Sequence, residues 1–246
     1  MSIKPLFRVH KNRAALYATA ADIFTEKAQA FIQKKEKFTV CLSGGKTPQP
    51  LYELLATPEY AEKVNWKKIH VFFGDERCVP SNHEDSNYGM IHEILLKKVK
   101  IPKSNVYKID GSKTPRQAAQ AYTQVFQEFY GAAKPSFDLA FLGMGQDGHI
   151  ASMFPGTDAV KIVRKRVREV YLGKKKTWRI TLTGSVFNRS KNVLVLVTGK
   201  KKAATLKNVI EGPYNPEELP AQLLRNAIGE VQWLLDEGVA SGLSDL

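Results

Sequence analysis

Three glycines, an acid and a histidine follow one apolar run closely enough to form a catalytic turn. The run covers 137–142, and the residues after it that could take part in chemistry are Gly143, Gly145, Asp147, Gly148 and His149. The run predicts a buried strand, and glycines let the chain turn sharply and let a ligand approach. Because open α/β sheets bind ligands at the carboxyl ends of their strands, we expect Asp147 and His149 to lie in a catalytic site.

His149 is the candidate general base. A neutral imidazole with an ordinary pKa of about 6.5 can accept a proton from water at neutral pH. A lone histidine is more often a hydrogen-bonded core residue, but the neighbouring acid and glycines favour catalysis. Asp75 and Arg77 follow the predicted strand Lys68–Phe73 and could hold a substrate or an oxyanion; a salt-bridged surface turn is equally consistent.

A second glycine-rich turn, Ser43-Gly44-Gly45-Lys46-Thr47-Pro48, follows the predicted strand Phe38–Leu42. Thr47 is expected to cap a helix that starts at Pro48. Free N–H groups and hydroxyls at a helix N-terminus suit one phosphate group. An ordinary capped turn explains the same residues equally well.

Two nucleotide motifs are matched only in part. Gly143-x-Gly145-x-x-Gly148 has the spacing of a dinucleotide fingerprint, but Pro155 interrupts the helix that this motif requires. Gly45-Lys46-Thr47 resembles the end of a P-loop, but Val40 stands where its first glycine belongs. No His or Cys pair has zinc spacing. We therefore expect neither a nucleotide cofactor nor a metal.

The elements that position these residues alternate along the chain between strands and helices, which favours a mostly parallel, Rossmann-like sheet in a three-layer α/β/α fold. We expect one domain over residues 1–246. The predicted helices other than the one at Pro48 are Asn12–Lys35, Met90–Leu96, Pro115–Tyr130 and Lys201–Ile210, with Ser81–Gly89 as a polar loop. The remaining predicted strands are Leu6–Val9, Val106–Tyr107, Val167–Leu172, Trp178–Leu182, Val193–Val197 and Val231–Leu235.

Composition and charge limit the classes of molecule that the protein is expected to bind. The net charge is 37 − 24 = +13, with dense basic stretches at Lys161–Arg168, Lys174–Lys176 and Lys200–Lys202. No aromatic RNA-binding motif accompanies them, so solvated basic faces are favoured over a nucleic-acid partner. No apolar run reaches the roughly 18 residues of a membrane span, and no signal peptide is evident. The two cysteines, Cys41 and Cys78, are expected to be reduced thiols in a cytoplasmic protein.

Several motifs, taken in order, resemble the 6-phosphogluconolactonase family. They span most of the chain: 42–48, 73–80, 86–88, 143–155, 179–183, 197–203, 211–213 and 220–224. The resemblance implies hydrolysis of 6-phosphoglucono-δ-lactone to 6-phosphogluconate in the oxidative pentose phosphate pathway. It also implies a small-molecule substrate and no metal or cofactor. The oligomeric state is expected to be a monomer or a weak homo-oligomer.

The resemblance also implies roles for individual residues. His149, with Asp147, would supply the general base, and Asp75 and Arg77 would line the lactone end, with Arg77 as the candidate for stabilising the oxyanion. The residues expected to hold the 6-phosphate are Ser43, Gly44, Gly45, Thr47, Arg179 and Lys202.

Two other functions stay open at this point. Glucosamine-6-phosphate isomerase/deaminases resemble the chain in both glycine-rich segments, but they carry a glutamate before the proline that follows the histidine. Here Phe154 precedes Pro155, and an apolar side chain cannot relay protons. A non-catalytic sugar-phosphate sensor would need a DNA-binding domain, for which the continuous α/β pattern leaves no room.

Overall fold

A computed structural model describes residues 6–161, 164–173 and 176–244. Its main sheet has seven strands in the order β1-β10-β9-β6-β2-β3-β5, and every pairing within it is parallel. The strands are β1 (Leu6–His10), β2 (Phe38–Leu42), β3 (Ile69–Phe73), β5 (Val106–Tyr107), β6 (Leu139–Gly143), β9 (Asn192–Val197) and β10 (Glu230–Asp236). The predicted parallel α/β sheet is confirmed.

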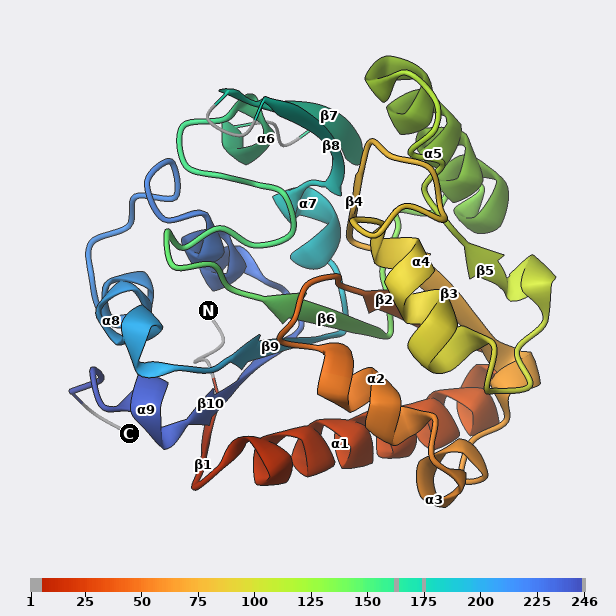
Figure 1. The fold of residues 1–246 in the computed structure, drawn as a ribbon, viewed down its shortest axis with the longest axis horizontal. Coiled ribbons are helices and arrows are strands. Elements are labelled where there is room, and N and C mark those ends of the chain that lie inside the picture. The colour runs from red at the N-terminus through yellow and green to blue at the C-terminus, as the bar shows by residue number, and fades with distance from the viewer. Residues whose placement is uncertain (1–5, 162–163, 174–175, 245–246) are drawn as a thin grey trace.

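Helices cover both faces of this sheet (Figure 1). The helix α1 packs against α2 and against β1, β2 and β10, whereas α5 packs against the strands of a second, smaller sheet. The α-helices are α1 (Arg13–Lys35), α2 (Gln49–Leu55), α3 (Pro58–Ala61), α4 (Asn87–Ile91), α5 (Pro115–Tyr130), α6 (Asp158–Lys161), α7 (Gly184–Phe187), α8 (Ala203–Ile210) and α9 (Glu237–Ala240). A π-helical turn, His92–Leu96, extends α4, and 3₁₀ helices cover Trp66–Lys68, Lys103–Asn105, Lys200–Lys202 and Pro220–Asn226.

The smaller sheet was not foreseen from the sequence. It is antiparallel, with the order β4-β8-β7, and consists of β4 (Asp75–Arg77), β8 (Thr177–Leu182) and β7 (Val167–Leu172). The connection between β7 and β8 is too short for the crossover that parallel strands need, so the two strands pair as a hairpin. The pairing of β4 with β8 places Asp75 and Arg77 on the edge of this sheet rather than on a free turn.

Two predicted helix starts are wrong. Helix α2 begins at Gln49, Pro48 holds its cap position, and no side chain caps it, because residues 46–48 form a separate turn. Helix α4 begins at Asn87 instead of Met90, since the Ser86 hydroxyl accepts a hydrogen bond from the N–H of Gly89. That Ser-capped start lay within the stretch expected to be a polar loop.

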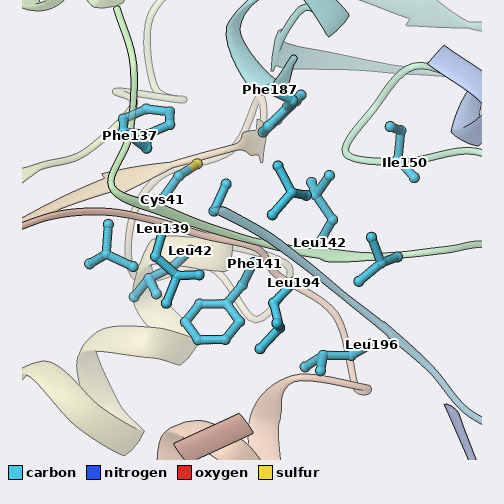
Figure 2. Close-up of a cluster of buried hydrophobic side chains, with 14 of the residues drawn as sticks. Cys41, Leu42, Phe137, Leu139, Phe141, Leu142, Ile150, Phe187, Leu194 and Leu196 are labelled. Carbon is cyan, nitrogen blue, oxygen red and sulfur yellow. The ribbon is translucent and has the colours of Figure 1, made fainter. Parts of the chain in front are cut away.

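The core lies on both sides of β6. Figure 2 shows Phe141, Leu194 and Leu196 on one side of the strand, and Ile150 and Phe187 on the other. On the first side, Phe24 of α1 packs on Phe141, with 6.3 Å between ring centroids. Burial on both sides holds β6 and its neighbour β2 in place, so the two glycine-rich turns leave from fixed and adjacent strand ends.

The cysteines are as predicted: Cys41 is buried, Cys78 is partly buried, and both are free thiols. Within the described part of the chain, no helix is long and apolar enough to cross a membrane.

Candidate active site

A cavity of about 250 Å³ opens where the two glycine-rich turns meet. The predicted site residues that line it come from β4, from β8 and from the segments that follow β2, β6 and β9: Ser43, Gly44, Gly45, Thr47, Asp75, Arg77, His149, Arg179 and Lys202. Asp147, the remaining predicted residue, lies behind His149 and lines a neighbouring hollow. The structure therefore brings together residues that the sequence placed on separate segments.

His149 is held by an acid on one edge and by an aromatic ring on one face. Its Nδ1 lies 2.5 Å from Oδ1 of Asp147, and the ring of Phe154 stacks on the imidazole with 4.0 Å between centroids. A Cβ at position 145 would lie 2.1 Å from Nδ1 of His149, so Gly145 is required for this arrangement. The Asp147 carboxylate accepts a hydrogen bond from Nδ1–H of His149, which leaves Nε2 free to take up a proton.

The pKa of Asp147 supports an ionised carboxylate. Burial alone would raise this pKa, but the hydrogen bond and the charge attraction from His149 outweigh it, and the pKa is lowered. An ionised acid is the partner that keeps the imidazole proton on Nδ1 and stabilises the imidazolium that forms when Nε2 is protonated.

Arg179 is a half-buried cation, and two of its guanidinium nitrogens are buried without a hydrogen-bond partner among the described residues. Antiparallel pairing sets it opposite Arg77 on β4, and its Nε and Nη1 have no hydrogen bond among the described residues. Burial lowers the pKa of Arg179, and the charge of Arg77 lowers it further. Like charges on opposed residues of paired strands destabilise a sheet, and buried donor atoms without a hydrogen-bond partner are costly. The pair is therefore suited to an anionic ligand.

The turn after β2 exposes backbone donors to the cavity. Gly45 has a φ of +90°, which favours glycine, and no hydrogen bond among the described residues engages the N–H of Gly44 or Gly45. Ser43 differs: its hydroxyl donates to the carbonyl of Phe141 at 2.7 Å, and its N–H donates to the Tyr52 hydroxyl at 3.0 Å. Both donors of Ser43 are thus used within the protein.

Lys202 reaches the cavity from the 3₁₀ helix that follows β9. Its Nζ donates to the carbonyl of Met144 at 2.6 Å, within the loop that carries His149. Burial lowers the pKa of Lys202, as does the charge of Arg13, while Asp236 opposes the shift.

Comparison with known proteins places this site in a family. A family model described as glucosamine-6-phosphate isomerases/6-phosphogluconolactonase matches residues 11–233. A 6-phosphogluconolactonase from Nostoc sp. is 36% identical over 98% of this chain and 100% of its own length. The chain belongs to this family.

Solved structures of related proteins show that the chain has the fold of the glucosamine-6-phosphate isomerase/6-phosphogluconolactonase family. A 6-phosphogluconolactonase from Trypanosoma cruzi superposes with a TM-score of 0.89 at 31% identity, covering 100% of this chain and 99% of its own. A monomeric glucosamine-6-phosphate deaminase superposes with a TM-score of 0.83 at 22% identity, covering 96% and 99%. Since a deaminase shares the fold, the fold alone does not distinguish the two activities.

The segment after β6 does not have the geometry of a dinucleotide-binding turn. The loop 144–157 separates β6 from α6, a helix of 4 residues. Within this described stretch no helix follows the glycines directly, as a dinucleotide fingerprint requires, and the absence of a nucleotide cofactor stays a prediction.

Sequence reasoning missed three residues that build the site, and Glu76 is the first of them. Glu76 is 1% exposed, and its carboxylate accepts hydrogen bonds from the N–H groups of Arg77, Asn87 and Tyr88. Burial raises the pKa of Glu76, and these N–H groups oppose the shift. Glu76 therefore joins β4 to the start of α4.

Ser152 and Asn87 are the other two, and both hold Asp75. Ser152 donates its hydroxyl proton to Oδ2 of Asp75 at 2.6 Å, and Nδ2 of Asn87 donates to the carbonyl of Asp75 at 2.9 Å. Asn87 also lines the cavity, and its Oδ1 is buried without a partner among the described residues. A local signal for Asn87 is Ser86, the N-cap of α4, because Asn87 is the first residue of that helix.

The packing of Asn87 on Gly44 gives a prediction. A Cβ at position 44 would lie 1.8 Å from Oδ1 of Asn87, so Gly44→Ala should lower the free energy of unfolding by about 1–3 kcal/mol. Denaturant unfolding measures the change. Gly143→Ala is the matched control, because no atom lies within 4 Å of a Cβ there. Equal stability of the two variants would contradict the close approach of Asn87 to Gly44.

Proposed function

We propose that this protein hydrolyses 6-phosphoglucono-δ-lactone to 6-phosphogluconate, a step of the oxidative pentose phosphate pathway. Membership of the family and the 36% identity to a relative named for this activity support the proposal. The observation that carries it is the presence, in one cavity, of a His149 bound to Asp147 and of Arg179, whose Nε and Nη1 have no hydrogen-bond partner in the described part of the chain. A base and an anion site together suit an ester that carries a phosphate.

In the proposed reaction, Nε2 of His149 takes a proton from water while the water oxygen attacks the lactone carbonyl. Arg77 stabilises the negative charge that develops on the carbonyl oxygen. The bond between the carbonyl carbon and the ring oxygen then breaks, and the ring oxygen receives the proton from His149. The products are a carboxylic acid, which ionises, and a free hydroxyl, so water is the only co-reactant.

The phosphate group anchors the substrate in this proposal. The free N–H groups of Gly44 and Gly45, the Thr47 hydroxyl, Arg179 and Lys202 bind it. Because its donors are engaged, Ser43 positions the turn and does not donate to the phosphate. Asp75, held by Ser152 and Asn87, accepts hydrogen bonds from the sugar hydroxyls. A phosphate held in this way orients the lactone for attack.

Purified protein should remove fresh 6-phosphoglucono-δ-lactone much faster than the spontaneous rate, and EDTA should leave the rate unchanged. Hydroxamate trapping of the remaining lactone measures both. The absence of a metal requirement stays a prediction; among the described residues, no group of three or more His, Cys, Asp or Glu side chains is placed to hold a metal ion. A lactone decay equal to the spontaneous rate would overturn the proposed function.

The deaminase alternative is tested in parallel. Phe154 stacks on the imidazole at the position where that activity needs a proton-relaying acid, so glucosamine 6-phosphate should release no ammonia. Ammonia release together with unchanged lactone decay would favour the deaminase.

The remaining expectations also stand as proposals: one domain, a monomer or weak homo-oligomer, no nucleic-acid partner and a cytoplasmic location. The buried residues of both faces of the main sheet belong to one hydrophobic core, which supports one domain.

A further inference from the structure

Two adjoining hollows lie outside the candidate active site and share the side chains of Arg164 and Arg166. One, of about 610 Å³, lies between α5 and the start of β7; the other, of about 370 Å³, continues toward α7. We call them together the basic groove, after the cations that line them: Arg116, Lys134, Arg164, Lys165, Arg166 and Arg189. None of these cations lines the candidate active-site cavity.

The cations of the basic groove are unpaired within the described part of the chain. No ion pair there involves any of the six, although lysines elsewhere pair with acids at many points. Glu169 is the one acid among the described lining residues. Residues 162–163 and 174–175 of the surrounding basic stretches lie outside the described residues. Six cations with a single acid among the described lining residues create a positive potential that attracts anions.

The groove is built on anchored backbone. The Thr183 hydroxyl donates to the carbonyl of Lys165 at 2.7 Å, and the Thr183 N–H donates to the carbonyl of Arg166 at 3.0 Å. On the far side, the Ser136 hydroxyl donates to the carbonyl of Arg189 at 2.7 Å. Because α5 also packs against β7 and β8, the walls that carry the cations are held in place before any ligand arrives.

The other lining residues indicate the ligand. Gln120 and Gln127 of α5 add neutral amide donors, and no aromatic side chain is among the described lining residues. Nucleic-acid bases would therefore have no ring to stack on, whereas guanidinium groups bind phosphate oxygens two at a time. We propose that the basic groove binds a chain of linked phosphate groups, recognised without a base.

Inorganic tripolyphosphate is the probe, and isothermal titration calorimetry is the measurement. The wild-type protein should bind tripolyphosphate, and binding should weaken at least tenfold between about 20 and 200 mM salt because exposed charges are screened. Orthophosphate should bind far more weakly. ATP should bind no more tightly than tripolyphosphate; tighter binding of ATP would show recognition of a base and overturn the proposal. Absence of tripolyphosphate binding at low salt would overturn it too.

Charge-matched variants locate the site. The double variant Arg164→Gln/Arg166→Gln should lose at least tenfold in affinity, whereas Lys98→Gln/Lys100→Gln, which removes the same charge from exposed residues outside both hollows, should bind as wild type. Arg179→Gln should also bind as wild type, which separates the groove from the candidate active site. If the Arg164/Arg166 and Lys98/Lys100 variants lost affinity for tripolyphosphate equally, the loss would come from the lower net charge of the protein and not from the groove. That result would contradict the proposal.

Two further readouts complete the test. The Arg164→Gln/Arg166→Gln variant should keep the wild-type rate of lactone hydrolysis. Its loss of tripolyphosphate binding is measured without lactone. The proposed lactonase activity and the proposed binding by the groove can therefore fail independently. An oligothymidine that displaces tripolyphosphate at equal phosphate concentration would identify a single-strand surface instead and overturn the proposal.

Discussion

Replacing His149 with alanine should lower kcat by a factor of about 10²–10⁴ while KM changes little. The physical reason is that a general base acts mainly in the transition state, where the proton leaves water. In the structure Nδ1 is committed to Asp147 at 2.5 Å, which leaves Nε2 for this transfer. Steady-state kinetics with correction for spontaneous lactone hydrolysis measures the effect.

Two companion variants show whether the loss belongs to the base itself. Asp147→Asn keeps the size of the side chain but removes the charge that holds the imidazole proton on Nδ1, so it should lower kcat and leave KM near the wild-type value. His92→Ala is the matched control, because His92 is partly exposed and does not line the cavity; it should be fully active. Near-wild-type turnover in His149→Ala would remove His149 from the mechanism.

The second large effect is expected at Arg179. Arg179→Gln should raise KM for the lactone by about 10- to 100-fold, because a charge-assisted hydrogen bond contributes about 1.5–3 kcal/mol. The same variant should unfold at an equal or higher temperature than wild type when no ligand is present. Its Nε and Nη1 lack partners among the described residues, and Arg77 opposes it across the strand pair, so removing the charge removes a repulsion.

Thermal unfolding with and without inorganic phosphate completes this test. Phosphate should raise the melting temperature of the wild-type protein, since a ligand that binds only the folded state stabilises it, and should do so much less in Arg179→Gln. Arg179→Lys keeps the charge but loses the bidentate geometry of a guanidinium. Its KM should therefore lie between those of the wild type and of Arg179→Gln. A destabilised Arg179→Gln variant with unchanged KM would mean that Arg179 supports the fold and does not bind the phosphate.

The fold class and the candidate residues were predictable because their signals are local. Alternating strands and helices, the apolar runs before Ser43 and Gly143, and the helix over Pro115–Tyr130 each depend on residues within one element. The ends of parallel strands share one edge of a sheet, so polar residues that directly follow such strands are candidates for a site by their position in the chain alone.

Only the tertiary structure decided which of these residues meet. Ser152 and Asp75 are 77 positions apart and share a hydrogen bond, and no local pattern encodes that contact. The separate β4-β8-β7 sheet sets Arg77 opposite Arg179, and the hydrogen bonds of Ser43 to Phe141 and Tyr52 use the donors that its sequence position offered to phosphate. Contacts of this kind depend on the packing of distant segments. The turn that carries Asp147 and His149, in contrast, was predictable from the sequence alone.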